Sequence, residues 1–453
     1  MVNSMTSGSP IRHIFRFMIP LLIGNLFALT HGMTEAFLLG RFLDSGALAA
    51  LGAAIAITWI CMDFANGLSI GSSYVTAQRF GAGDMPAVRR SFVACHIILL
   101  AQAIIITVLG LLFSRYFLTL MNVPDDIIDQ AHAYSLVIFA GMVAYALVIV
   151  YANAMHAVGN SKTPLYFRSL ISIAGIGFNL LFIIFYRMDI RGVAYSIVIS
   201  QLISGTLFAI YVYRKVPALK ISRADWKISF AELWDHLRLG LPLGVQQVVI
   251  NMGFIATQFA LNNLGPTTMA GFVAATRVAH FAFFPIMSFG VAAGTFAAQN
   301  YGAGKMRRVV KGLKQCCFAS VAVCIFIGIM VQLFGVRVAS IFIYGSPESI
   351  SVAGTFLAVG SLFYWATSLV IIFRSTLLGI GKKVVPAISG FMEMIIGASL
   401  VLTLPRFLGH LGIAVAAPIN TISLLTLLSI ALFVTMRKLV AREDRLTEMG
   451  DEP

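Results

Sequence analysis

Long runs of apolar residues alternate with short polar segments along most of the chain. Each run has about 20 residues or more, the length that a helix needs to cross the hydrocarbon core of a membrane. The runs are too uniformly apolar for barrel strands, which alternate, and open strands cannot satisfy their backbone groups in lipid. The pattern predicts an all-α integral membrane protein with twelve spans, at residues 14–40, 46–77, 92–114, 131–157, 165–186, 192–213, 239–262, 269–298, 316–343, 351–378, 385–404 and 411–436.

The composition strengthens this prediction. The chain has 453 residues, of which 59% are hydrophobic and only 11% are charged, and a soluble protein of this size could not hide so much apolar surface. The first span follows a polar opening segment and is too long for a cleaved signal peptide. We therefore expect it to be retained as the first membrane helix.

The net charge of +14 is explained by the positions of the basic residues. If both termini are cytoplasmic, 24 of the 32 Lys and Arg residues lie in internal loops, termini or cytoplasmic ends of spans, and six lie in external loops. The other two, Arg277 and Arg374, lie inside spans. This is the positive-inside distribution. It predicts a multi-pass protein of the plasma (bacterial inner) membrane and requires no nucleic-acid partner.

Cysteine and motif content give no sign of an enzyme. The five cysteines lie in or beside spans without metal-ligand spacing, so we interpret them as packing residues and expect no metal site. No H-E-x-x-H metalloprotease motif occurs. We expect no catalytic residues and no cofactor other than a coupling ion.

Two similar glycine-containing stretches indicate an internal repeat. "QRFGAGDMPAVRRS" begins at Gln78 and "QNYGAGKMRRVVKG" begins at Gln299. Sliding one half over the other by about 222 residues also aligns Pro20 with Pro242, "GNSKTP" with "GKKVVP", and "RGVAYS" with "LGIAVA". Four ordered matches at a nearly constant offset predict that the chain is two copies of one six-span design.

The repeat predicts the domain organisation. We expect an N-terminal six-helix lobe at 1–213, a basic cytoplasmic linker at 214–236, a C-terminal six-helix lobe at 237–440 and a cytoplasmic tail at 441–453. Because six is an even number, both lobes enter the membrane in the same orientation. They should therefore be related by a pseudo-two-fold axis along the membrane normal, as in transporters with parallel repeats that work by alternating access.

The glycine stretches do not match a phosphate-binding loop. A P-loop requires G-x-x-x-x-G-K-[ST] between a strand and a helix. Gln299 stands where the first glycine should be, Met306 replaces the Ser or Thr, and Asp84 replaces the lysine in the first copy. We interpret both stretches as tight turns that their basic residues hold in the cytoplasm.

Taken together, these features resemble the multidrug and toxic compound extrusion (MATE) family. The resemblance covers almost the whole chain and is carried by "IPLLIGNLFALTHGMTEAFLLGR" in the first span, by the two "GAG" stretches, and by the "GNSKTP" and "GKKVVP" turns. It implies an export carrier for amphipathic small molecules, often organic cations, that is driven by a proton or sodium gradient and surrounded by membrane lipid. We expect a monomer.

Of the eighteen acidic residues, only Glu35, Asp63 and Glu393 fall well inside spans. A charge at the centre of a bilayer costs roughly 2.5–3.5 kcal/mol on insertion scales, so such residues usually face a cavity or a partner. Glu35 shares one helical stripe with His31, one turn earlier. A protonatable acid in a cavity suits proton coupling, and the alternative is an acid that His31 neutralises to stabilise packing.

The resemblance adds further candidates for the coupling site. Glu35 stands where the family usually has Asp, and the family places an Asn near this acid, here Asn179. Some members have an Asp one turn later, where this chain has Ile183, so a fuller carboxylate cluster is absent. Gln201 could supply another polar contact. For Asn179, an interhelical hydrogen bond is an equally good interpretation.

Candidate substrate-binding residues lie in both lobes. Asp63 could attract a cation and Trp59 could offer a cation–π surface, or Asp63 could pair with a neighbouring helix or an Arg. Glu393 could be a second titrating or binding acid. Met33 could be an adaptable contact, although a Met in a membrane helix is more often lipid-facing or part of the core. The seventh span offers Gln246, Gln247 and Asn251 in the C-terminal lobe.

The seventh span also bears on the coupling ion. The sodium-coupled branch of the family commonly carries an acid there, whereas this chain has none in that span. Sodium is a hard cation that prefers oxygen ligands, so this difference favours proton coupling. One alternative is sodium-coupled export. Another is a flippase for lipid-linked sugars, whose cavity would be strongly cationic. Arg277 and Arg374 are too few basic residues inside the spans to form such a cavity.

Overall fold

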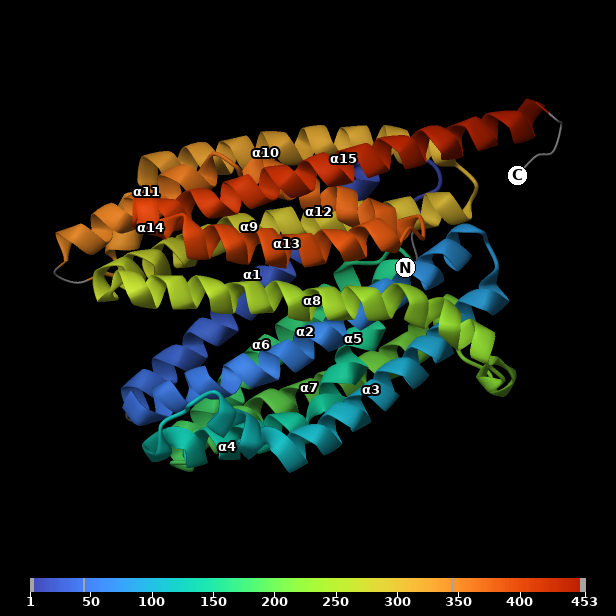
Figure 1. Ribbon diagram of the computed structural model, residues 1–453. Helices are drawn as coiled ribbons and strands as arrows, with labels where there is room; N and C mark the ends of the chain where they lie inside the picture. Colours follow the sequence, from blue (N-terminus) through green and yellow to red (C-terminus); the bar gives the residue numbers. More distant parts are fainter. Residues whose placement is uncertain (1–3, 44, 344–345, 449–453) are drawn as a thin grey trace. The chain divides into compact units, whose positions relative to one another are not determined.

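The computed structural model describes residues 4–43, 45–343 and 346–448 (Figure 1). In this part of the chain every regular element is helical, which confirms the all-α prediction. The elements are α1 (Pro10–Phe42), α2 (Ser45–Gly81), α3 (Met85–Leu120), α4 (Asp125–Ala140), α5 (Met142–Ala157), α6 (Lys162–Asn179), the π-helix η1 (Leu180–Phe185), α7 (Arg191–Lys215), the 3₁₀ turns η2 (Pro217–Leu219) and η3 (Arg223–Trp226), α8 (Phe230–Leu264), α9 (Pro266–Gly302), α10 (Met306–Ser340), α11 (Pro347–Ser361), α12 (Tyr364–Gly379), α13 (Val384–Thr403), α14 (Pro405–Leu408) and α15 (His410–Glu448).

The helices give twelve membrane spans if two bent pairs are counted as one span each. Ten helices are long and apolar enough to cross a membrane, and α4–α5 and α11–α12 form the other two spans with bends of 49° and 50°. The sequence predicted the spans 131–157 and 351–378 as single helices. Because the apolar run continues through each break, hydropathy does not reveal the bend.

The described chain forms two compact units. Unit 1 is built from Ile19–Val245, and unit 2 from Met5–Met18 and the chain from Gln246 onward. The first part of α1 therefore belongs to unit 2, and the first part of α8 belongs to unit 1. The predicted lobe boundaries at 213 and 237 were drawn from the sequence repeat, whereas the two units are defined by which residues pack together. The boundaries therefore stay a prediction. Residues 449–453 of the predicted tail lie outside the described chain.

One helix lies at the centre of each unit. In unit 1, α2 packs against α3, α4 and α5, and in unit 2, α9 packs against α10, α11 and α12. The first part of α8 lies directly on α2 because of glycines: a Cβ on Gly71 would lie 2.6 Å from the Cα of Gly240. Close backbone approach at small residues is the usual way in which membrane helices pack.

The duplicated turns have the same backbone conformation in both copies. Gly83 and Gly304 have φ values of 79° and 73°, and Gly159 and Gly381 have φ values of 77° and 81°. Glycine adopts these left-handed values without the steric cost that a Cβ brings. The interpretation of the Gly-Ala-Gly stretches as tight turns between helices is confirmed.

The arginines after the first turn hold the linker that leads into α8. Arg90 Nε donates to Glu232 Oε1 at 2.9 Å, and Arg89 Nε lies 3.5 Å from Asp225 Oδ2. All four residues belong to unit 1. The sequence analysis gave these arginines only a topological role, whereas their side chains fix the start of α8 on unit 1.

The basic residues after the second turn hold the segment that leads into α1. Arg308 donates to the carbonyl oxygens of Met5, Ser7 and Gly8 at distances of 2.7–3.3 Å. The amide of Met5 donates to Gln299 Oε1 at 2.9 Å. Equivalent turns thus anchor equivalent segments, but by different chemistry: acidic side chains in unit 1 and backbone carbonyls in unit 2.

The anchor in unit 2 predicts a stability difference between neighbouring arginines. Arg308→Gln removes charged donors from three carbonyls and should destabilise the segment by about 2 kcal/mol. Arg307→Gln is the matched control, because Arg307 forms an exposed ion pair with Asp444 that should contribute less than about 1 kcal/mol. Hydrogen exchange of residues 5–9 checks this, and equal protection in the two variants would contradict it.

The anchor in unit 1 predicts a pH dependence. Burial acts to raise the pKa of Asp225, but hydrogen bonds from Ser222 and the charge of Arg89 outweigh it and lower this pKa. A lowered pKa stabilises the fold above the pKa of the unfolded chain, and the contribution is lost as the pH falls through the folded pKa. Asp225→Asn should therefore destabilise the protein by about 1 kcal/mol at pH 7, and the difference should shrink below about pH 4.

Thermal unfolding in detergent at pH 7 and pH 3 measures this effect. Asp129→Asn is the control, since Asp129 is an exposed residue whose partner is Arg115. If Asp225→Asn destabilises the protein equally at both pH values, the carboxylate is not the stabilising form.

Candidate functional site

The predicted coupling acid forms a close pair with the histidine one turn before it on α1. His31 Nε2 lies 3.2 Å from Glu35 Oε1, and both side chains are 14% exposed. The pair lacks hydrogen-bond geometry, so Glu35 Oε1 and His31 Nδ1 have no hydrogen-bond partner in the described chain. Glu35 Oε1 therefore lies beside an imidazole nitrogen and is free to accept a proton or another donor.

Helix α6 approaches this pair through a glycine. A Cβ on Gly175 would lie only 2.3 Å from His31 Cε1. Nearer the start of both helices, Arg168 Nη1 donates to Asn25 Oδ1 at 3.1 Å. The two contacts occur in the same order along α1 and α6, so the helices advance in the same direction, and Asn179 falls at the level of Glu35.

Asn179 is a buried amide without a partner in the described chain. Its side chain is fully buried, and neither Oδ1 nor Nδ2 has a hydrogen-bond partner. An unsatisfied buried polar group costs about 1–3 kcal/mol. The π-helix η1 begins at the next residue, Leu180. Short π-helical segments within helices are frequent at functional sites. The interhelical hydrogen bond that the sequence offered as an alternative for Asn179 is not formed here.

The register of α7 places Gln201 away from this level. Ser196 Oγ donates to the carbonyl of Gly175 at 2.7 Å, and Ser204 Oγ donates to the carbonyl of Phe167 at 2.9 Å. Gln201 lies between these two points, on the far side of Gly175 from Asn179. The structure thus places Asn179 at the level of the pair of His31 and Glu35, and it places Gln201 at another level.

A second polar group in unit 1 surrounds Asp63. Tyr145 Oη donates to the carbonyl of Met62 at 3.3 Å and lies within electrostatic range of both Asp63 and Arg168. Arg168 Nη1 donates to Asn25 Oδ1 at 3.1 Å. Both sequence interpretations of Asp63, a substrate contact and a pairing within the protein, stay predictions.

The sequence analysis missed Arg168 and Tyr145. Arg168 was counted with the basic residues at the cytoplasmic end of its span, yet it lies six residues after Lys162, about 9 Å along α6. An arginine this far along a membrane helix could have been recognised from the sequence as a candidate site residue. Trp59 and Met33 are 61% and 49% exposed, respectively, so both remain available for contact.

In unit 2, Glu393 forms a salt bridge. Arg374 Nη2 donates to Glu393 Oε2 at 2.7 Å, and Arg374 Nε donates to Ser389 Oγ at 3.1 Å. Asn420 Nδ2 donates to the carbonyl of Glu393 at 2.9 Å. The acid is thus neutralised by a buried arginine, which gives it a structural partner that the sequence analysis did not identify.

The polar residues of the seventh span are held by their neighbours. Gln246 is buried, and its Nε2 donates to the carbonyl of Pro386 at 3.2 Å. Asn251 Nδ2 donates to the carbonyl of Gln247 within α8 at 3.1 Å. Gln246 therefore serves packing between α8 and α13, while Gln247 and Asn251 stay partly exposed.

A Gly-x-Ser-x-Gly pattern at 67–71 does not form a nucleophile site. It lies inside α2, whereas the catalytic motif needs a sharp turn from a strand to a helix. Ser69 is buried; Asn153 Nδ2 donates to its Oγ at 2.8 Å, and this Oγ donates to the carbonyl of Ile149 at 3.4 Å. The described residues contain no group of three or more His, Cys, Asp or Glu that could hold a metal ion.

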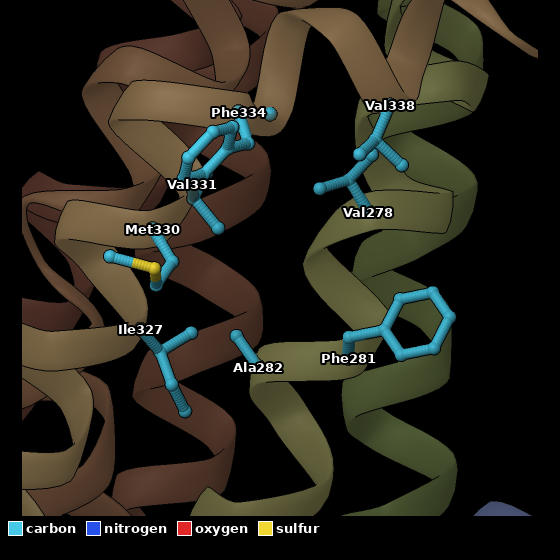
Figure 2. Close-up of a pocket in the computed structure, with 9 residues that line it drawn as sticks. Val278, Phe281, Ala282, Ile327, Met330, Val331, Phe334 and Val338 are labelled. Carbon is cyan, nitrogen blue, oxygen red and sulfur yellow. The ribbon is translucent and has the colours of Figure 1, made fainter.

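A groove in unit 2 lies apart from all these residues. It has a volume of about 400 Å³ and runs between α9 and α10, as Figure 2 shows. None of the predicted site residues lines it. The lining consists of Val278, Phe281, Ala282, Ile327, Met330, Val331, Phe334, Gly335 and Val338.

Comparison with known proteins identifies the family. The MatE family profile matches residues 20–183 and 242–403, so the two matches begin at Pro20 and Pro242 and confirm the repeat. The chain is 27% identical over 363 residues to the probable multidrug resistance protein YpnP of Bacillus subtilis, covering 79% of this chain and 80% of that protein. It is 23% identical over 374 residues to the FAD transporter of Shewanella oneidensis, covering 81% of each chain.

Solved structures agree on the fold. An outward-facing multidrug resistance MATE family transporter of the MOP superfamily superposes with a TM-score of 0.90 at 20% identity, covering 96% of this chain and 98% of that one. A transporter of the same superfamily from Pyrococcus furiosus superposes with a TM-score of 0.88 at 20% identity, with the same coverage. The chain therefore belongs to the MATE family of multidrug efflux transporters and is a multi-pass membrane transporter, not an enzyme.

Proposed function

We propose that this protein exports amphipathic small molecules, organic cations among them, by antiport with protons that bind at Glu35. The observation that carries the proposal is the pairing of Glu35 with His31 at the level of the unpartnered amide of Asn179. Membership of the family and the names of the relatives supply the substrate class. The pair of Glu35 and His31 supports the choice of the coupling residue.

The chemistry of the pair favours a proton. With His31 neutral, an ionised Glu35 gives the site a net negative charge, which is costly inside a membrane. Uptake of one proton gives a neutral pair, either as the acid beside imidazole or as carboxylate beside imidazolium. Loss of that proton to the cytoplasm then resets the charged state. Such a cycle drives transport because the two conformations bind the proton unequally.

Sodium is the second candidate ion. Glu35 Oε1 and Asn179 Oδ1 are oxygens without hydrogen-bond partners, and hard cations prefer oxygen ligands. The atom next to Glu35 Oε1 is a nitrogen of His31, at 3.2 Å, rather than a further oxygen. The membrane-spanning part of α8, residues 239–262, carries no acid, which favours a proton over sodium.

The cellular setting is also part of the proposal. Basic residues on the side of both termini support a plasma membrane protein with cytoplasmic ends. Alternating access between inward-open and outward-open states, by a monomer, would complete the transport cycle. The flippase alternative needs a strongly cationic cavity, and in unit 2 Arg374 is already neutralised by Glu393.

Glu35→Gln should abolish export driven by a pH gradient, because the amide cannot take up a proton. We would reconstitute the protein in liposomes and follow a fluorescent cationic dye under an imposed proton gradient, then under an imposed sodium gradient. Glu35→Asp, which restores the acid that the family usually carries, should retain transport. Full proton-driven transport by Glu35→Gln would overturn the coupling role.

Gly175→Ala should impair coupling without removing any titratable group. The added Cβ would lie 2.3 Å from His31 Cε1, so the imidazole must move, at a cost of about 1–3 kcal/mol typical of overpacking. Gly177→Ala on the same helix is the matched control, because a Cβ there meets nothing within 4 Å. The pH profile of dye transport should shift in Gly175→Ala alone. Identical profiles in both variants would show that the position of His31 is unimportant.

A further inference from the structure

The groove between α9 and α10 has the chemistry of a hydrocarbon site. Every side chain that lines it is apolar. Sites for drug-like ligands are largely apolar too, but they include a few polar groups that fix the orientation of the ligand. A groove without such groups suits a flexible acyl chain, whose binding needs only apolar contact.

The length of the groove corresponds to one leaflet of a bilayer. Between Lys314 and Arg337, α10 carries no charged residue, and these 22 residues span about 33 Å, close to the roughly 30 Å of a hydrocarbon core. The groove follows α10 from Val338 to Ile327, a distance of about 16 Å. It therefore begins at the edge of the core that Arg337 marks and ends near the middle of the membrane.

A cationic residue stands at the outer end of the groove. Val278 lies beside Val338 at this end (Figure 2), and Arg277 directly precedes Val278. Arg277 is exposed and forms no ion pair or hydrogen bond within the described chain. His280, also exposed, follows three residues later on the same side of α9. An arginine this near the edge of the core can extend its guanidinium to the level of the headgroups.

We propose that this groove binds one acyl chain of a membrane phospholipid with a net negative headgroup, whose phosphate contacts Arg277. The apolar lining provides the contact for the chain, and the guanidinium provides charge-assisted hydrogen bonds to the phosphate oxygens. The charge of Arg277 and the length of the groove favour a lipid over a transported drug. This site is distinct from the pair of His31 and Glu35 and does not depend on which ion drives transport.

Photolabelling in a membrane tests the proposal. The full-length protein is reconstituted in phosphatidylcholine vesicles with a trace of phosphatidylglycerol that carries a photoactivatable group in one acyl chain. Mass spectrometry should locate the label on α9 and α10 at the groove. Unlabelled phosphatidylglycerol should compete at least about tenfold better than phosphatidylcholine, a factor that corresponds to one charge-assisted contact.

Paired variants separate the headgroup from the chain. Arg277→Gln should abolish the preference for phosphatidylglycerol, whereas Arg277→Lys should keep most of it and Arg406→Gln, a charge loss elsewhere in unit 2, should keep all of it. Ile327→Trp should fill the groove and prevent labelling, whereas Phe326→Trp, on an exposed neighbour outside the lining, should not.

Two results would overturn the proposal. One is an unchanged lipid preference in Arg277→Gln, and the other is equal labelling of the groove in Ile327→Trp and Phe326→Trp. If Arg277→Gln altered the transport of an anionic dye but not the labelling, the groove would serve a substrate and the lipid proposal would fall. Because export of a cationic dye is measured separately, failure here leaves the proposed function testable.

Discussion

A charged or strongly polar side chain inside a membrane must meet a partner, water or a headgroup, and this constraint governs where the few polar residues of the spans lie. Glu35 meets His31 on its own helix, and Glu393 meets Arg374 on the neighbouring one. Arg277 remains without a partner in the described chain, near the edge of the hydrocarbon core. These three polar groups correspond to the proposed coupling site, a structural salt bridge and the proposed lipid site.

The compensation of the two acids differs in a way that matters for function. The guanidinium of Arg374 can only donate, and it donates to Glu393 at 2.7 Å, so this pair is a structural salt bridge. An imidazole nitrogen can either donate or accept, and Glu35 Oε1 faces one without a hydrogen bond to it, so this pair offers a place for the exchangeable proton of the proposed cycle. The unsatisfied amide of Asn179 at the same level adds a polar group that a packing site would not need.

The internal repeat conserves geometry more closely than chemistry. The turn glycines Gly83 and Gly304 share a left-handed backbone, and in both copies the basic residues that follow hold the segment before a first helix. In unit 1 the partners are carboxylates, which respond to pH, and in unit 2 they are carbonyls, which do not. Two copies of one fold can therefore carry one coupling site and one structural salt bridge.

Much of the architecture followed from the sequence alone. The helical class, the twelve spans and the two copies could be predicted because hydropathy and the spacing of Pro20 and Pro242 are properties of the chain itself. Glu35 and His31 could be paired in the same way, since a separation of four residues places them on one helical stripe.

Only the tertiary structure decided the rest, because it depends on which helices pack together and in which register. The contact of Gly175 with His31 brought Asn179 level with Glu35 and left Gln201 elsewhere. The bends near Gly141 and Phe363 interrupt continuous apolar runs, which hydropathy cannot distinguish from straight helices. The partner of Glu393 and the groove beside Arg277 arise between consecutive helices, α12 with α13 and α9 with α10. Which faces of these helices meet depends on their packing, which a linear pattern does not record.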